Sequence, residues 1–234
     1  MQIAAFDIET CPHQNLPAGV TPEFDPDSVK HGNTKDEDKR QAKEAQARAI
    51  FKHGLDKTMS LHPDLCQVIT FCGMLHDTAT GVISQVVVTS GEPATIENGW
   101  QWIKEAYKSF TPLVSFNGVG FDLPVMFHRA IDLQVPVSGR MLKDLTKRYN
   151  PQGHYDLMQF LSGWDRQKYE SLDFYLKRYG IGTKTGDGSQ VYGMWKNGQI
   201  KEIEEYCMAD VLKTAQLFAR LELWIVEGSG IEDA

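Results

Sequence analysis

The chain opens with a short apolar run in which polar and apolar positions do not alternate. The run covers residues 3–8 and ends on acidic residues. A strand that is covered on both faces has a continuous apolar sequence, whereas a half-exposed strand alternates. The pattern therefore predicts that the first element is a buried central β-strand.

Two further apolar runs, at residues 66–75 and 82–89, are rich in β-branched residues. The turn-forming segment 77–81 separates them, which predicts a β-hairpin. A third run at residues 113–116 is short and follows a helical pattern, so we expect one more strand there.

Four segments carry apolar residues at the spacing of a helical face. The first ends near residue 110, the second follows residue 120, the third covers residues 171–179, and the last runs from residue 201 to about 226. Gly180 stops the third helix. The predicted apolar positions are Ile96, Trp100, Ile103, Tyr107 and Phe110 in the first helix, Phe121, Val125, Phe127 and Ile131 in the second, and Ile203, Cys207, Val211, Ala215 and Phe218 in the last.

A charged segment interrupts this order after the first strand. Residues 12–26 are rich in Pro, Gly and Asn, and residues 36–53 combine many charges with good helix formers. We expect a largely solvated helix within an insertion at about residues 28–58. Its charged surface either faces water or forms a lid or clamp that touches a substrate.

The order of strands and helices predicts an α/β fold with a mixed sheet. The 234 residues, 41% of them hydrophobic, are enough to bury one sizeable core. No internal repeat is visible. We therefore expect a single domain over residues 1–234.

The charge balance limits the classes of function. The 24 Lys and Arg against 31 Asp and Glu give a net charge of −7. This balance argues against a protein that holds nucleic acid mainly by bulk positive charge. It suits an enzyme that binds divalent cations, because two such ions would offset more than half of the net negative charge.

The sequence shows neither a secretory leader nor a run long enough to span a membrane. We therefore expect a cytoplasmic protein that makes no membrane contact. Its four cysteines have neither zinc-site spacing nor the density of a disulfide scaffold, which predicts free thiols. They are Cys11, Cys66, Cys72 and Cys207.

Two acids lie at the end of the first predicted strand. Asp7 and Glu9 are separated by one residue, so the strand period points both carboxylates to the same side while Ile8 faces the other. Two like charges this close resist joint ionisation unless a cation compensates them. The pair is a candidate metal site, although an acidic surface pair would have the same spacing.

A third acid follows the predicted strand at 113–116, where a glycine-broken turn opens a helix. In the first turn of that helix Asp122 could stabilise the helix dipole, by about 0.3–1 kcal/mol. Asn117 could likewise be an ordinary turn residue. A second acidic position after a second strand, with Phe121 beside it to stack on a base, favours a functional interpretation.

The last helix carries Tyr206 and Asp210, which are four residues apart and share one face. Such a pair can also be an incidental polar edge. The three acidic elements are more specific together, because each acid falls at the end or start of an element whose apolar face lies elsewhere.

These elements resemble the three exonuclease motifs of the DEDD superfamily, in their usual order. The matching segments are Phe6-Asp7-Ile8-Glu9-Thr10, Asn117-Gly118-Val119-Gly120-Phe121-Asp122 and Tyr206-x-x-x-Asp210. With a tyrosine at this position of the last motif, the chain resembles the DEDDy subclass. That subclass includes the proofreading domains of family-A and family-B DNA polymerases. The histidine subclass would need a histidine where Glu205 stands.

More narrowly, the chain resembles freestanding predicted 3′→5′ exonucleases related to the family-B polymerase exonuclease domain. The charged insertion, the run at 66–75, His154-Tyr155-Asp156-Leu157 and Gly186-Asp187-Gly188-Ser189 carry this resemblance. It implies a ribonuclease H-like fold, with a central mixed sheet flanked by helices.

The resemblance also implies hydrolysis of phosphodiester bonds with two Mg²⁺ or Mn²⁺ ions, about 4 Å apart. Hard oxygen ligands favour these ions over zinc. Asp7 would bridge both ions, Glu9 and Asp210 would complete one, and Asp122 would hold the other through water. Tyr206, with an unperturbed pKa of about 10, is a poor base at neutral pH and would orient a metal-activated water.

Five further residues are candidates for substrate contacts or support. Thr10 would contact the terminal sugar, while Asn117 and Phe121 would position the last nucleotides by hydrogen bonding and stacking. Lys184 either meets a phosphate or is solvated. Asp156 either supports the site or caps a helix.

The expected substrate is the 3′ end of single-stranded or frayed DNA, trimmed with little dependence on base sequence to nucleoside 5′-monophosphates. One alternative is the same chemistry on RNA, because contacts to the 2′-OH cannot be located from the sequence. A second alternative is a catalytically silent nucleic-acid-binding module. Nothing in the sequence indicates an oligomeric state.

Overall fold

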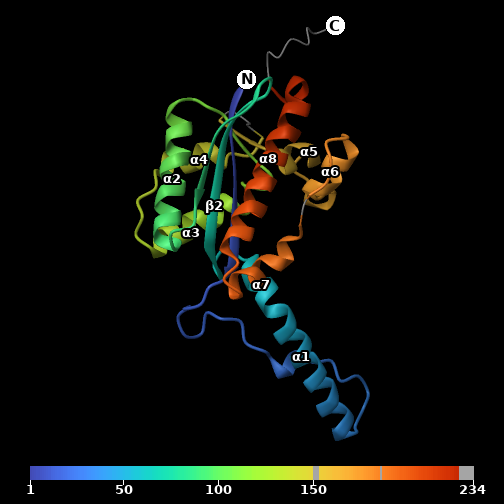
Figure 1. Cartoon of the computed structure of the whole chain (residues 1–234). Helices are drawn as coiled ribbons and strands as arrows, with labels where there is room; N and C mark the ends of the chain where they lie inside the picture. Colours follow the sequence, from blue (N-terminus) through green and yellow to red (C-terminus); the bar gives the residue numbers. More distant parts are fainter. Residues whose placement is uncertain (150–152, 185, 227–234) are drawn as a thin grey trace.

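A computed structural model describes residues 1–149, 153–184 and 186–226, which fold around a five-stranded sheet of order β3-β2-β1-β4-β5 (Figure 1). The strands β1, β2 and β3 pair antiparallel, whereas β1, β4 and β5 run parallel. This arrangement confirms the predicted mixed sheet. The strands are β1 (Gln2–Pro12), β2 (Cys66–Asp77), β3 (Gly81–Val88), β4 (Leu113–Ser115) and β5 (His154–Asp156).

Strand β1 lies in the middle of the sheet and is covered on both faces. Ile3 and Ala5 belong to the core on one face, and Phe6 and Ile8 to the core on the other. Both faces exclude water, which explains why the run does not alternate. The apolar opening therefore predicted the central strand correctly.

One face of the sheet carries α2 (Glu92–Lys108), α3 (Asp122–Asp132) and α4 (Gly139–Leu145). The indole N–H of Trp100 on α2 donates to the carbonyl of Met126 on α3, at 3.0 Å. This bond ties the two helices together within the core.

The opposite face carries α5 (Leu157–Ser162), α6 (Leu172–Arg178) and the long helix α8 (Ile200–Ile225). The predicted apolar stripe of α8 is fully buried, from Ile203 to Phe218. The short helix α7 (Val191–Lys196) packs with the start of α8 against the end of β1. Single 3₁₀ turns lie at Pro26–Ser28, Arg166–Lys168 and Gly188–Gln190.

The charged segment forms α1 (Glu37–Ser60), which projects away from the sheet in Figure 1. The helix is longer than the predicted 36–53, because Gly54 weakens a helix without ending it. The Asp36 carboxylate accepts from the backbone N–H of Lys39 and caps the first turn. Met59 is the one buried residue of α1, which agrees with a solvated helix; the clamp interpretation stays a prediction.

Two predicted core positions are wrong. Phe110 lies beyond the end of α2 with a φ of +57° and is 92% exposed. Ile131 lies on α3 but faces water, because Leu123, Val125 and Met126 form the buried stripe of that helix. Helical spacing alone therefore placed the apolar face of α3 too far around the helix.

The sequence did not predict the short elements β5, α4, α5 and α7. Each spans seven residues or fewer, so it offers at most two turns of a periodic pattern. The predicted domain range 1–234 includes residues outside the described ranges and stays a prediction. Within the described residues, no helix combines the length and apolar character needed to cross a bilayer.

Replacing Phe218 on α8 by alanine should lower the free energy of unfolding by about 3–5 kcal/mol, because the side chain is fully buried and its loss leaves a cavity. Urea denaturation followed by circular dichroism measures this change. The exposed Phe110 provides a matched control, since Phe110→Ala should alter the stability by about 0.5 kcal/mol at most. Equal effects at both positions would contradict the described packing of α8.

Candidate active site

The first two acids lie on β1, on the side that faces α8. The ligand atoms of Asp7, Glu9 and the Cys207 thiol of α8 all lie within 4.8 Å of one another. The thiol also lies 3.6 Å from the backbone carbonyl of Asp7. The strand spacing therefore brings both carboxylates together, as predicted.

The turn after β4 adopts a conformation that needs its two glycines. Asn117 has a φ of +74°, in the left-handed region. A Cβ on Gly118 would lie 2.3 Å from the Ser115 hydroxyl, and one on Gly120 would lie 2.3 Å from the Asn117 amide oxygen. Only glycine fits at both positions, so the chain can turn sharply and begin α3 at Asp122.

Asp156, at the end of β5, holds this turn in place. Its carboxylate accepts from the backbone N–H groups of Asn117, at 3.0 Å, and Val119, at 2.8 Å. It also accepts from the N–H of Gln159 and so caps α5. Asp156 thus has both of the roles considered from the sequence. It caps a helix, and it supports the turn that leads to Asp122.

Asp122 is buried and points back to β1. Its Oδ1 atom accepts from the backbone N–H of Ile8 at 3.2 Å, between the two acids of the strand. The Asp122 carboxyl also lies close enough to Asp7 for its charge to raise the pKa of Asp7. The third acid therefore joins the cluster at β1.

Helix α8 contributes Tyr206 and Asp210, both buried. The ammonium of Lys184 lies 2.5 Å from Asp210 and 5.3 Å from the centre of the Tyr206 ring. A Cβ on Gly186 would lie 2.9 Å from that ring, so Gly186 packs closely against the tyrosine. Lys184 is 24% exposed and is therefore not a freely solvated lysine.

The remaining candidates are less directly connected to the acids. The Thr10 hydroxyl donates to the carbonyl of Ser60 at 2.7 Å and ties β1 to the end of α1. Phe121 is half-buried and packs against the core under α2 and α3. Asn117 faces the turn, where its amide oxygen approaches Gly120.

Burial raises the pKa of every acid in the cluster, and repulsion from the other cluster acids adds to this effect for Asp7 and Glu9. For Asp7, burial has the largest effect, followed by the charges of Asp122, Glu9 and Asp210. Burial and then Asp210 raise the pKa of Glu9. Burial raises the pKa of Asp122 to about 7, against hydrogen bonds that lower it.

The protein supplies only one cation to this cluster within the described residues. Burial raises the pKa of Asp210, and Lys184 partly offsets that effect. Burial acts to lower the pKa of Lys184, but attraction to Asp210 outweighs it, so the pKa lies above its usual value. Burial also raises the pKa of the Tyr206 phenol, which keeps its proton at neutral pH.

The donor set fits a hard divalent cation. Among the described residues, the Oδ1 atom of Asp210 is buried without any hydrogen-bond partner. A buried acceptor without a donor costs free energy, which a bound cation would recover. The nearby Cys207 thiol does not change this preference, because burial and Cys72 raise its pKa and keep it protonated.

The sequence did not identify three structural contributors to the site. His154 holds β4 through a bond from its ring to the Ser115 hydroxyl, at 2.8 Å. Gly186 permits the close approach to Tyr206, and Cys207 lies beside Asp7. The available signals were the position of Cys207 next to Tyr206 in the last motif and the presence of His154 and Gly186 in segments that carry the family resemblance.

Comparison with protein-family models matches residues 59–229 to the family described as a predicted 3′-5′ exonuclease related to the exonuclease domain of PolB. The matched segment contains Asp122, Tyr206 and Asp210, and it begins after Asp7 and Glu9. No curated protein matches the chain.

Similar solved structures include the family B DNA polymerase from the hyperthermophilic archaeon Pyrobaculum calidifontis. The TM-score is 0.55 at 17% identity, over 94% of this chain and 24% of the polymerase. A structure of exonuclease I matches with a TM-score of 0.36 at 16% identity, over 70% of this chain and 39% of that protein. The chain thus spans less than two thirds of either protein.

The likeness to the polymerase confirms the predicted ribonuclease H-like fold. Because the family model covers most of its length, the chain belongs to the family of predicted 3′-5′ exonucleases related to the exonuclease domain of PolB.

Proposed function

We propose that this chain is a metal-dependent 3′→5′ exonuclease that hydrolyses phosphodiester bonds at the 3′ end of single-stranded or frayed DNA and releases nucleoside 5′-monophosphates. One observation carries the proposal. Four carboxylates converge from β1, the start of α3 and α8, and one of their buried oxygens has no donor among the described residues. Membership of an exonuclease family supports the class of reaction.

The residues that would hold the metal are Asp7, Glu9, Asp122 and Asp210, and the cation would be Mg²⁺ or Mn²⁺, with two ions per site. When bound, these ions would supply a reactive water at neutral pH and neutralise the charge of the phosphate. Asp7 would be the shared ligand, because its carboxyl lies beside that of Glu9 and the charges of Asp122, Glu9 and Asp210 all raise its pKa.

The other side chains orient the reactants. Tyr206 keeps its proton at neutral pH, so its phenol orients the attacking water by hydrogen bonding and does not act as a base. Asn117 and Phe121 lie on the turn beside Asp122 and would position the last nucleotide, with Thr10 near the terminal sugar. Lys184 is bound to Asp210, so it can meet a phosphate only after this ion pair breaks.

In the proposed reaction the oxygen of water bonds to phosphorus while the bond from phosphorus to the 3′ oxygen breaks. The shortened strand keeps a 3′-hydroxyl, and the removed nucleotide keeps the 5′-phosphate. Repeated cycles would trim a strand from its 3′ end.

Glu9→Gln should slow trimming of a 5′-labelled single-stranded oligonucleotide in Mg²⁺ by about a hundredfold or more. This is the scale on which the loss of one electrostatic group lowers kcat. The same change should leave the melting temperature in EDTA unchanged or higher, because it removes a buried acid whose pKa is raised. Gel analysis of the product ladder and thermal melting measure the two effects.

The matched control is Glu97→Gln, at an exposed glutamate on α2, which should trim at the wild-type rate. Unchanged trimming by Glu9→Gln would contradict the proposed site. A matched RNA oligonucleotide separates the alternatives. Faster trimming of RNA would make the chain an exoribonuclease, and binding without any hydrolysis would make it a silent module.

The metal-free protein should lose stability as the pH rises from about 4 to 7. In this window folded Asp122, whose pKa is raised to about 7, still holds the proton that the unfolded chain has released. Since metal binds the deprotonated acids, Mn²⁺ should raise the melting temperature more at pH 8 than at pH 6. Differential scanning fluorimetry in EDTA and in Mn²⁺ measures both trends.

Glu97→Gln should show the same pH trends as the wild type, whereas Asp122→Asn should reduce both. A Mn²⁺ shift that is equal at pH 6 and pH 8, or that survives in Asp122→Asn at full size, would contradict metal binding by this cluster.

A further inference from the structure

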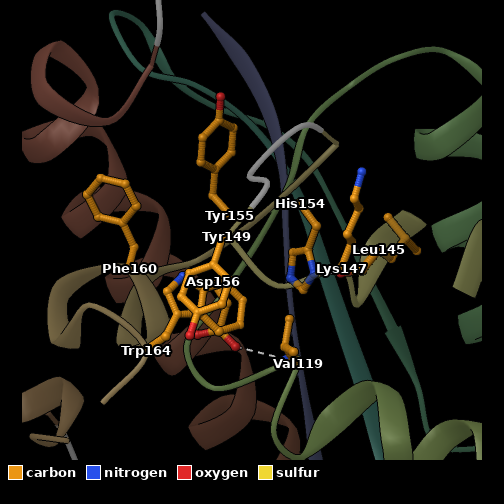
Figure 2. A pocket seen from close by; sticks show the side chains of 9 residues that line it. All are labelled: Val119, Leu145, Lys147, Tyr149, His154, Tyr155, Asp156, Phe160 and Trp164. Atoms are coloured by element: carbon orange, nitrogen blue, oxygen red, sulfur yellow. Dashed lines mark hydrogen bonds between the residues drawn. The ribbon is translucent and has the colours of Figure 1, made fainter. Parts of the chain in front are cut away.

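The turn that positions Asp122 also lines surface hollows that contain none of the four acids. Three adjoining hollows meet at Val119, the tip of this turn. The first, of about 240 Å³, is shown in Figure 2. We call these hollows together the Val119 groove. The aromatic and basic side chains that line the groove and carry the argument are Lys147, Arg148, Tyr149, Phe160, Trp164 and Arg166.

Aromatic side chains are displayed along the groove. The rings of Tyr149 and Trp164 lie 5.3 Å apart at an angle of 50°, and Tyr149 is 72% exposed. Phe160, on α5, lies at the same hollow and is also exposed (Figure 2). Large exposed aromatic side chains that gather in one hollow indicate a binding surface.

The backbone at the two paired rings is strained. Tyr149 has a φ of +59° and Trp164 a φ of +64°, the left-handed region that bulky residues rarely adopt. Such strain costs about 1–3 kcal/mol per residue and persists where the surrounding structure enforces it, often at ligand sites. Both rings of the pair are thus held in place at an energetic cost.

Unpaired positive charge accompanies the rings. Lys147, Arg148 and Arg166 line the groove, and none of them takes part in an ion pair within the described residues. Their neighbours Arg140 and Lys168, in contrast, pair with aspartates. A local excess of free cations in a chain of net charge −7 favours an anionic ligand.

The groove is joined to the acid cluster through Asp156. This buried carboxylate lines the first hollow. Its oxygens accept hydrogen bonds from the backbone N–H groups of Asn117 and Val119. The same turn continues into Asp122, which contacts β1. The groove and the acids are therefore fixed relative to each other by one short, hydrogen-bonded segment.

We propose that the Val119 groove binds the part of a single-stranded nucleic acid that lies 5′ of the nucleotide being removed, a role that rests on the proposed function. Unstacked bases pack on Tyr149, Trp164 and Phe160, and phosphates contact Lys147, Arg148 and Arg166. Stacking accepts any base, and phosphate contacts carry no sequence information. Paired bases in a duplex hide their faces, so the groove selects single strands.

The test measures binding of 5′-fluorescein oligodeoxynucleotides of 3 to 12 nucleotides by anisotropy, in Mg²⁺, with the Glu9→Gln protein. Adding Trp164→Ala should weaken binding of the 12-mer about tenfold, the scale of one lost base stack. The loss should grow with oligonucleotide length. Arg148→Ala, at an exposed position, should weaken binding and reduce the salt dependence of log K by about 0.7.

Matched controls lie near the C-terminal end of α8, where Arg220 packs over the exposed Trp224. Trp224→Ala and Arg220→Ala repeat the two substitutions at a surface outside the groove and should leave binding unchanged. Thermal melting verifies that each protein folds, and Arg148→Ala tests the groove without altering any aromatic ring.

The two proposals fail in different ways. If the wild-type protein trims the oligonucleotide but Trp164→Ala and Arg148→Ala bind it as tightly as the controls do, the groove assignment is overturned and the exonuclease proposal stands. If the wild-type protein does not trim but the groove variants lose affinity, the exonuclease proposal fails and the groove remains a nucleic-acid surface.

Discussion

The repulsion among four neighbouring carboxylates, two of them buried, is the constraint on which the rest of the site depends. Asp7, Glu9, Asp122 and Asp210 raise one another's pKa or have it raised by burial, and Lys184 is the one ammonium in contact with the group within the described residues. Such an arrangement lowers stability, so the scaffold must hold it. Under the proposed function, bound divalent cations would relieve the repulsion.

The scaffold holds the acids by using the parallel half of the sheet. Strands β1, β4 and β5 run in the same direction, so their carboxyl ends meet at one edge. Asp7 lies on β1, the turn to Asp122 follows β4, and Asp156 at the end of β5 holds that turn by two backbone hydrogen bonds. Helix α8 closes the site from one face.

The sequence predicted the elements with strong periodicity and the residues with a recognisable motif. The apolar run of β1, the hairpin and the stripe of α8 needed only local patterns. The contact of Asp122 with Ile8, the ion pair of Lys184 with Asp210 and the pairing of Tyr149 with Trp164 join distant segments, which periodicity cannot reveal. Phe110 and Ile131 were misplaced because helical spacing does not show where a helix ends or which neighbour covers it.

The most direct test is a crystal structure of the protein with Mn²⁺ and a short oligonucleotide whose last linkage resists hydrolysis. Anomalous scattering at the manganese edge would locate the metal without reference to activity. The account predicts manganese between Asp7, Glu9, Asp122 and Asp210, with the last phosphate beside it and Tyr206 near that phosphate. Manganese bound elsewhere, or a 3′ end distant from these acids, would contradict it.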